Sequence, residues 1–292
     1  TVIDFHTHIF SPEVKNNRSY FLRKDSSFET LYSRADSKII TADNLINVMD
    51  EKMINCAVVM GIGWNELDSA KASNDYIIES CQKYKDRLIG LGSVNPVLGD
   101  DALNELNRCL DSGLVGMGEI HPDLQQFNLD DFNVMNQFMT ELKLKNGLLL
   151  THSSEPVGHL YTGKGFTTPD KIWRFLNMFP DSNVVLAHWG GGLPFYSLMP
   201  EVSEAISNFY FDTAASPYLY SKSIFDIANQ LIGPERILFG SDYPLISQSR
   251  IINQIKDSRL LAEEQQKIFS DNAIRLLAKL KGGEDTRIYE FQ

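Results

Sequence analysis

The chain has few of the features that mark secreted, disulfide-stabilised or membrane-spanning proteins. Only three of its 292 residues are cysteines, and Cys56, Cys81 and Cys109 form no C-x-x-C pair. We expect these thiols to fill the core of a protein in a reducing compartment. The apolar runs are far too short to span a bilayer, and no basic segment leading into an apolar stretch follows Thr1. We therefore expect a cytoplasmic protein.

The chain also lacks an excess of positive charge. It has 27 Lys and Arg residues against 38 Asp and Glu residues, which gives a net charge of −11. Surfaces that bind nucleic acids or anionic membranes are basic, so we expect neither partner and instead a small-molecule substrate. A homodimer or other homo-oligomer is the usual state of such proteins and is our default expectation.

Two further absences concern the fold. No glycine-rich phosphate loop follows the first apolar run, and no internal repeat, low-complexity tract or linker divides the chain. Instead, short β-rich apolar runs alternate with amphipathic stretches of helical spacing. The expected strands are 2–5, 56–62, 88–94, 114–120, 147–152, 183–188, 209–213 and 236–241. The expected helices are 42–52, 70–85, 101–112, 131–145, 169–178, 222–231, 249–256 and 263–279.

Eight strands that alternate with helices predict an α/β protein, a parallel (β/α)8 TIM barrel, as a single domain over residues 1–292. An open doubly wound sheet is the alternative. The missing phosphate loop favours the barrel, as does the clustering of polar residues at the C-terminal ends of the strands, which form the active face of a barrel.

One connection is much longer than the others. Residues 10–40 form an extended loop after the first strand, with mixed aromatic and charged side chains such as Arg23 and Arg34. A segment of this length is often a lid or a wall over a substrate. The alternative is a surface excursion with a short helix around residues 28–33, and the sequence supports both interpretations equally.

The first strand ends in the triplet His6-Thr7-His8. Side chains alternate along a strand, so we expect Asp4, His6 and His8 on one face. Two imidazoles at this spacing can chelate one metal ion, with Asp4 one step deeper to orient a ligand. The H-x-H triplet alone is weak, because two solvent-facing histidines are at least as common.

Other strand ends carry metal-binding residue types as well. The fourth, fifth, sixth and eighth expected strands deliver Glu119, His152, His188 and Asp242 to the same rim. A buried Glu is costly unless it is paired or bound to metal. His121 shares a face with Glu119. We rank two roles for it, orienting a ligand or contacting substrate, above the role of a metal ligand. His159 follows in a loop, where it is either an ordinary loop histidine or a substrate contact.

The pattern of H-x-H, Glu, His, His and Asp on strands one, four, five, six and eight resembles the amidohydrolase superfamily. The stretches A-H-W-G-G-G-L-P-F (187–195) and I-L-F-G-S-D-Y-P (237–244) are similar to its amidohydrolase-related branch. That branch includes aminocarboxymuconate-semialdehyde decarboxylase and metal-dependent hydrolases of the TIM-barrel fold. D-N-A-I-R-L-L (271–277) is similar to the terminal helix of the branch, so the resemblance covers essentially the whole chain.

The resemblance implies that His6, His8, His152 and Asp242 bind a divalent ion, most often Zn2+, with Mn2+ as an alternative. It places Glu119 where binuclear members carry a bridging carboxylate. A second ion would then be held by Glu119, His152 and His188. With a single ion, His188 would instead be a catalytic group.

Two activities compete for this site. We expect hydrolysis of an amide, ester or lactone first, with Asp242 moving the proton of an activated water and His188 steadying the oxyanion. Glu119 favours this choice, since a bridging carboxylate suits water activation.

The alternative activity is metal-dependent, non-oxidative decarboxylation of a small aromatic or unsaturated acid. It needs a cationic or aromatic clamp, for which the sequence offers Arg23, Arg34, Trp64, Lys164 and Trp189. A non-catalytic metal-binding protein is the third alternative, and Asp242 and His188 exceed what it requires.

Overall fold

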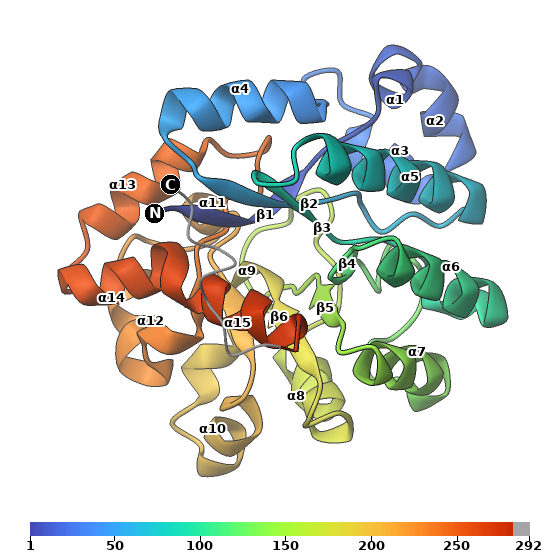
Figure 1. The fold of residues 1–292 in the computed structure, drawn as a ribbon. Helices are drawn as coiled ribbons and strands as arrows, with labels where there is room; N and C mark the ends of the chain where they lie inside the picture. Colours follow the sequence, from blue (N-terminus) through green and yellow to red (C-terminus); the bar gives the residue numbers. More distant parts are fainter. Residues whose placement is uncertain (283–292) are drawn as a thin grey trace.

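Eight parallel strands form a closed barrel with helices around its outside (Figure 1). The computed structural model describes residues 1–282. Within them, β1–β2–β3 and β4–β5–β6–β7–β8 form two parallel groups. Bridges between Gly92 and Met117 and between Thr7 and Tyr243 join the groups on both sides and close the ring. The predicted TIM barrel is confirmed. The strands are β1 (Ile3–His8), β2 (Cys56–Met60), β3 (Leu88–Gly90), β4 (Gly116–Ile120), β5 (Leu148–Thr151), β6 (Asn183–Leu186), β7 (Tyr210–Asp212) and β8 (Ile237–Leu238).

Helices follow the strands and cover the barrel. Their starts have local causes: the Thr41 hydroxyl accepts a hydrogen bond from the backbone N–H of Asn44 at the start of α4, and Pro169 opens α8, where no N–H is needed. The helices are α1 (Pro12–Asn16), α2 (Arg18–Lys24), α3 (Ser26–Tyr32), α4 (Ala42–Lys52), α5 (Leu67–Lys83), α6 (Asp100–Asp111), α7 (Phe132–Leu144), α8 (Pro169–Met178), α9 (Ala187–Gly190), α10 (Pro200–Ile206), α11 (Ser216–Leu219), α12 (Ile224–Ile232), α13 (Gln248–Lys256), α14 (Ala262–Gln266) and α15 (Asn272–Leu280). Short turns of 3-10 helix are η1 (Pro96–Leu98), η2 (Leu193–Tyr196) and η3 (Pro234–Arg236), and η4 (Lys267–Asp271) is a π-helical turn.

One end of the barrel is closed by α15, which crosses it in front in Figure 1. Its Leu276 and Leu277 are buried in the same apolar cluster as Ile3 and Phe5 of β1. The polar side chains therefore lie at the opposite end of the barrel, at the C-terminal ends of the strands. None of the helices within residues 1–282 combines the length and apolarity needed to cross a membrane.

The 10–40 segment, expected as an extended loop, contains the three helices α1, α2 and α3. Its aromatic residues explain the difference, because Phe21 and Phe28 are buried and pack against Trp64. The carboxylate of Asp25 caps α3 by accepting hydrogen bonds from the backbone N–H groups of Ser27 and Phe28. The segment therefore forms a helical layer beside the mouth of the barrel.

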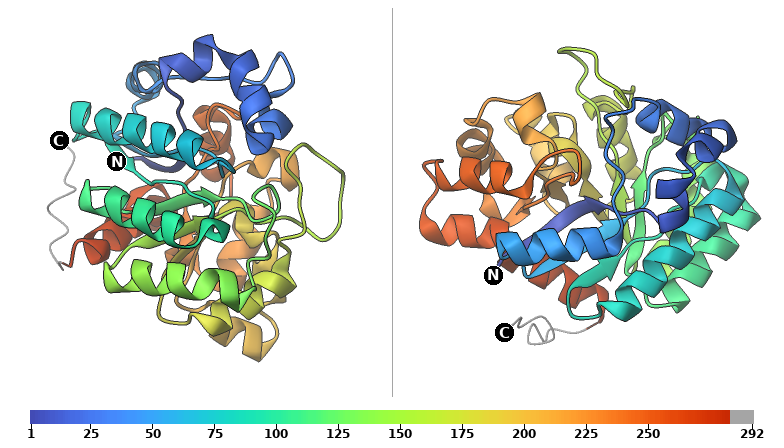
Figure 2. Two further views of the ribbon diagram at one scale, coloured as in Figure 1. Left: turned by 90° about the vertical axis from the view of Figure 1, so that its right-hand side faces the viewer. Right: turned by 90° about the horizontal axis from the view of Figure 1, so that it is seen from above.

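A second long connection, the β5–α8 loop (residues 152–168), stands out from the barrel rim in both views of Figure 2. The carboxylate of Asp123 holds the C-terminal end of this loop. It accepts hydrogen bonds from the backbone N–H groups of Phe166 and Thr167 and from the Thr167 hydroxyl. The 10–40 segment and the β5–α8 loop thus both border the same end of the barrel.

Candidate metal centre

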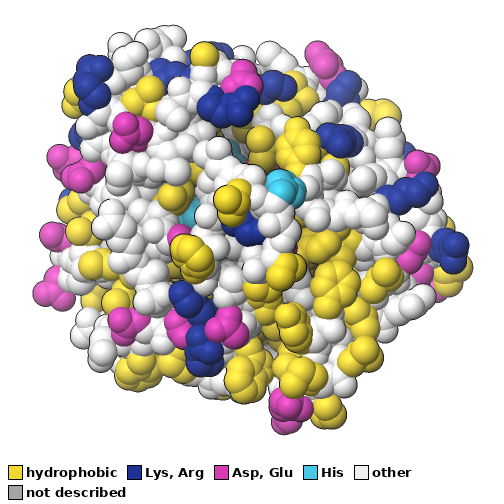
Figure 3. Space-filling model, turned by 180° about the vertical axis from the view of Figure 1, so that it is seen from behind, with side chains coloured by type: hydrophobic (Ala, Val, Ile, Leu, Met, Phe, Trp, Pro, Cys, Tyr) yellow, Lys and Arg dark blue, Asp and Glu magenta, His cyan; other side chains and the backbone are white. Residues whose placement is uncertain are grey.

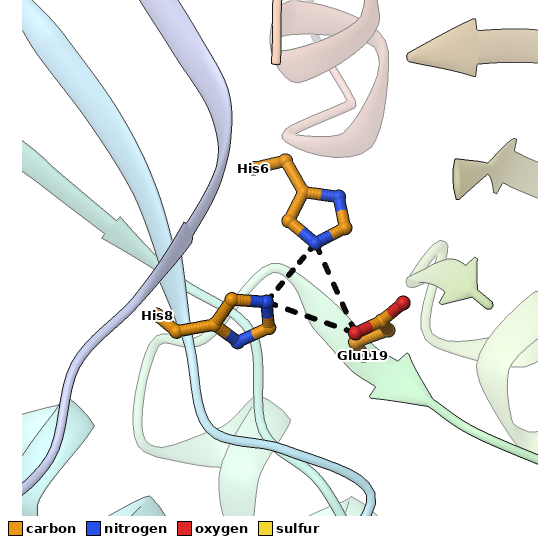
Figure 4. Close-up of side chains that lie close together, drawn as sticks. All are labelled: His6, His8 and Glu119. Carbon is orange, nitrogen blue, oxygen red and sulfur yellow. Dashed lines mark hydrogen bonds and ion pairs between the residues drawn. The ribbon is translucent and has the colours of Figure 1, made fainter. Parts of the chain in front are cut away.

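Two histidines of β1 and a glutamate of β4 meet at the centre of the barrel mouth (Figure 4). Nε2 of His6 lies 3.1 Å from Nε2 of His8. Oε2 of Glu119 lies 3.9 Å from the His6 nitrogen and 3.7 Å from the His8 nitrogen. All three side chains are buried. The three atoms converge on one point, as a chelating site requires.

The other oxygen of Glu119 faces two more histidines. Nδ1 of His152, just after β5, lies 2.9 Å from Oε1, and Nε2 of His188, just after β6, lies 3.4 Å from it. Asp242, beyond β8, completes the cluster with Oδ1 at 3.3 Å from Nε2 of His8. The structure therefore brings together every residue expected to bind metal, with Glu119 between the two groups of histidines.

The hydrogen bonds of Nδ1 in His6 and His8 fix which ring nitrogen faces the centre of the cluster. Nδ1 of His6 donates to Asp212 Oδ2 at 2.7 Å, and Nδ1 of His8 donates to the carbonyl of Gly61 at 2.8 Å. In their neutral forms both rings then turn Nε2 lone pairs toward each other. Two lone pairs at 3.1 Å repel unless a proton or a metal cation lies between them, so these residues fit a metal ion.

Asp212, at the end of β7, is the residue that the sequence interpretation missed. It is fully buried, and besides His6 it accepts hydrogen bonds from the backbone N–H groups of His188 and Ala214. The available signal was its position, because an Asp at the end of an expected strand meets the same criterion as Glu119. Asp212 therefore links two histidines of the cluster, His6 and His188.

Asp4 was expected to orient a ligand from one step deeper in the barrel. The register of β1 shifts between Asp4 and Thr7. The Asp4 carboxylate accepts hydrogen bonds from the hydroxyl and the backbone N–H of Ser241 and from the Gln248 amide. Asp4 therefore holds the turn that carries Asp242.

Left-handed backbone positions His188 and Asp242. Their φ angles are 56° and 64°, and Trp189 follows with a φ of 58°. Such conformations are uncommon for residues other than glycine and cost on the order of 1 kcal/mol or more each. The expected strand 183–188 ends at Leu186 because the chain turns sharply there. This turn directs the His188 ring toward Glu119.

The carboxylates make the cluster strongly favourable for positive charge. Burial opposes a charged ring at His6, but the adjacent Asp212 carboxylate raises its pKa to about 9. Burial likewise opposes charge at His188, and the Glu119 carboxylate raises its pKa to about 10. Burial would raise the pKa of Glu119, yet hydrogen bonds with His152 and His188 hold that pKa well below its usual range. A divalent cation supplies the same positive charge without protons.

The cluster forms the floor of a cavity of about 1050 Å³. His8, Glu119, His152, His188 and Asp242 line its floor, and its walls come largely from the 10–40 segment and the β5–α8 loop. Figure 3 shows histidine side chains within a hollowed part of this face, bordered by hydrophobic side chains. The apolar and aromatic wall residues are Leu31, Tyr32, Ile62, Leu160, Tyr161, Tyr218, Leu219 and Leu245.

Two of the expected substrate contacts, His121 and His159, line this cavity, and a third, Lys164, lies in the adjacent β5–α8 loop. The ring of His121 stacks on that of His152 with centroids 3.8 Å apart, and its Nε2 donates to the carbonyl of Gly163. His159 is exposed at the rim. Lys164 donates from Nζ to the carbonyls of Val157 and His159, so it braces the β5–α8 loop beside the cavity.

The tryptophans lie elsewhere, which corrects their expected role. Trp64 is buried and stacks on Phe28, and Trp189 is buried with its indole N–H donating to Ser216. Neither lines the cavity. Of the expected arginine clamps, Arg23 is exposed away from the cavity, and Arg34 lines the cavity but is paired with Asp36.

Comparisons with known proteins identify the fold and the family. A family model described as amidohydrolase matches residues 3–279. The solved structure of a dihydroxybenzoic acid decarboxylase from Polaromonas, with bound manganese and the inhibitor 2-nitroresorcinol, superposes with a TM-score of 0.74 and 19% identity. The superposition covers 96% of this chain and 97% of that one.

Two curated relatives are decarboxylases as well. The 2-amino-3-carboxymuconate-6-semialdehyde decarboxylase of Dictyostelium discoideum is 24% identical over 78% of this chain and 73% of that protein. The 6-methylsalicylic acid decarboxylase of Penicillium expansum is 32% identical over 37% of this chain. That match spans only 38% of the Penicillium protein's length.

The expectation of amide, ester or lactone hydrolysis is wrong, because these relatives break a C–C bond to a carboxyl group. The inference from Glu119 failed because a carboxylate between two pairs of imidazoles suits metal binding in either chemistry. The relatives and the cluster support an enzyme with a divalent metal ion. With its model matched over residues 3–279, the chain belongs to the amidohydrolase family, in the branch of aminocarboxymuconate-semialdehyde decarboxylase.

Proposed function

We propose that the chain is a metal-dependent, non-oxidative decarboxylase of a small aromatic carboxylic acid. The observation that carries this proposal is the cluster of imidazoles and carboxylates at the floor of a cavity with aromatic and apolar walls. The names of the relatives support the same reaction. A cavity of about 1050 Å³ has ample room for a ring of this size.

The donor set supports the proposed metal ligands. His6, His8, Glu119 and Asp242 present ring nitrogens and carboxylate oxygens to one point, and His152 and His188 flank the second oxygen of Glu119. A bound Mn2+ or Zn2+ ion would supply a fixed positive charge for the anionic oxygens of the acid. Asp212 and the Gly61 carbonyl keep the nitrogens of His6 and His8 oriented for this role.

The reaction also needs one proton. The bond between the ring carbon and the carboxylate breaks, its electron pair remains on the carbon, and that carbon takes up a proton as carbon dioxide leaves. His188 is placed to deliver it, because Nδ1 faces the carbonyl of Ala214 at 3.2 Å and Nε2 faces Glu119 at 3.4 Å. Both partners accept hydrogen bonds, which favours a protonated His188 ring at the cavity floor.

The proposal is tested by measuring carbon dioxide release from a panel of ring acids. The panel consists of 2,6-dihydroxybenzoate, 6-methylsalicylate and 5-carboxyvanillate, each with protein loaded with Mn2+, loaded with Zn2+ or stripped by a chelator. We expect metal-dependent release of one carbon dioxide per acid consumed. An amide, an ester and a lactone serve as counter-substrates. Metal-dependent acid release from these, without decarboxylation of any ring acid, would contradict the proposal.

A further inference from the structure

Tyr32 ends α3 at the wall of the cavity, and its ring is held on two sides. The ring stacks on Phe28 with centroids 4.9 Å apart and an interplanar angle of 16°, and Phe28 in turn stacks on Trp64 at 5.4 Å and 9°. Phe10 meets the Tyr32 ring edge-on at 5.0 Å. This stack fixes where the Tyr32 hydroxyl lies.

Arg18 fixes the backbone of the same wall. Its guanidinium donates to the carbonyls of Tyr32, Arg34, Ala35 and Ser37, which together form the end of α3 and the turn after it. Five fixed donors of one planar group suit this arrangement of carbonyls. The position of Tyr32 therefore depends on contacts within the 10–40 segment, not on the barrel strands.

The Tyr32 hydroxyl has a chemical environment unlike that of the other wall tyrosines. Within residues 1–282 it has no hydrogen-bond partner, whereas the Tyr161 hydroxyl donates to Glu155 and the Tyr218 side chain is 49% exposed to solvent. Burial, followed by the negative charges of Asp242 and Glu119, raises the pKa of Tyr32. The group thus stays protonated near the cavity floor and is a hydrogen-bond donor with no acceptor in the protein.

An anionic substrate faces a specific problem in this cavity. Glu119 and Asp242 line the floor and repel a carboxylate, so beyond the positive charge that a bound ion would supply, an acid needs hydrogen-bond donors from the wall. The Arg34 guanidinium is engaged with Asp36, and Lys164 is engaged with backbone carbonyls. The other wall side chains that carry a donor without an acceptor in residues 1–282 are exposed, whereas Tyr32 is partly buried; they are Lys38, His159, Thr162 and Tyr218.

We propose that the Tyr32 hydroxyl donates a hydrogen bond to an anionic oxygen of the bound ring acid and so selects acids over neutral ring compounds. This inference rests on the proposed function, since it assumes that an aromatic acid occupies the cavity. It assigns substrate recognition to a residue of the 10–40 segment.

The test is isothermal titration of Mn2+-loaded protein with 2-hydroxybenzoate and, separately, with neutral 2-hydroxybenzamide. A hydrogen bond to a charged oxygen is strong, so Tyr32→Phe should raise the dissociation constant of the acid about tenfold or more. The same substitution should change amide binding by less than about twofold, because the ring stack is retained. Tyr20→Phe, at an exposed tyrosine of the same segment, is the matched control and should change neither.

Two other variants keep the outcome decisive. Arg18→Gln should weaken acid binding by a smaller factor, since it loosens the wall and retains the hydroxyl. An unchanged acid affinity in Tyr32→Phe, an equal loss for acid and amide, or a loss that appears only in Lys38→Gln would overturn the assignment of Tyr32. Failure of the unaltered protein to bind the acid would overturn the proposed function as well. If Tyr32→Phe selectively weakens acid binding but the unaltered protein releases no carbon dioxide, the proposed reaction is refuted and the role of Tyr32 in binding stands.

Discussion

The floor and the wall of the cavity are built in opposite ways. On the floor, the candidate metal-binding side chains come from strands or strand ends, are buried, and have partners fixed by the barrel. On the wall, residues such as Arg34 and His159 are exposed and belong to long connections that Arg18 and Asp123 hold by backbone hydrogen bonds. The difference teaches that the chemistry resides in the rigid part of the molecule, while the choice of substrate resides in the part that the barrel does not determine.

The strongest way to break the floor is to remove one of its imidazoles. His8→Ala deletes the nitrogen that lies within 4 Å of His6, Glu119 and Asp242, so we expect metal content and decarboxylation to fall to the level of chelator-stripped protein. Plasma mass spectrometry and a carbon dioxide assay measure both quantities. His159→Ala at the rim is the control for metal content. A His8→Ala protein that retains one ion per chain would show that these residues do not hold the metal.

A smaller loss of metal binding is expected when the Asp212 carboxylate, which contacts His6 from behind the cavity floor, is neutralised. Asp212→Asn keeps the shape of the side chain but removes the charge beside His6 Nδ1, and the metal affinity should fall roughly 10- to 100-fold. Competition with a metal indicator dye measures the change. Asp43→Asn, at an exposed aspartate that pairs with Lys83, should leave the affinity unaltered. Equal affinities in the two variants would refute the role of Asp212.

The wall should respond with a change in substrate binding and not in metal binding. Asp123→Asn weakens the hydrogen bonds that fasten the β5–α8 loop, and we expect KM for the ring acid to rise roughly 3- to 10-fold with kcat and metal content little changed. Steady-state kinetics and metal analysis separate the two effects. A loss of metal in this variant would show that floor and wall are not independent.

The smallest effect concerns the stability of the metal-free protein. The pKa of His6 rises from 6.5 to about 9, because the Asp212 carboxylate outweighs the opposing effect of burial. A raised pKa means that the proton stabilises the fold fully below pH 6.5, and this stabilisation is lost as the pH rises to about 9. The melting temperature of chelator-treated protein should therefore fall by a few degrees over that interval. Metal-loaded protein should show no such fall, and Asp212→Asn should flatten it.

The barrel and its floor could be predicted because both follow from local patterns. Strand and helix periods alternate along the chain, and the carboxyl ends of parallel strands meet at one rim, so Glu119, His152 and His188 had to lie close together once the barrel was assumed. Asp212, at the end of β7, obeys the same rule, but no motif beside it marks it as part of the site. The register shift within β1 after Asp4 is not visible in a residue pattern.

The wall could not be predicted in the same way. Trp64 was expected at the substrate, yet it packs behind Phe28, which stacks on Tyr32, because tertiary contacts decide which aromatic residue reaches the cavity. No period or motif distinguishes Tyr32 from Tyr20 in the sequence. The choice between hydrolysis and decarboxylation could not be predicted either. The floor residues fit both reactions, and the wall residues that select the substrate follow no sequence pattern.

The central claim is that the buried cluster supports cleavage of a bond to a carboxyl carbon without addition of water. The most direct measurement is turnover of a ring acid by Mn2+-loaded protein in D2O, with carbon dioxide quantified and the ring product analysed by mass spectrometry and NMR. The account predicts one carbon dioxide per acid consumed and one deuterium at the carbon that carried the carboxylate, both abolished by chelator. A product that instead carries an oxygen atom from isotopically labelled water at the site of cleavage would contradict it.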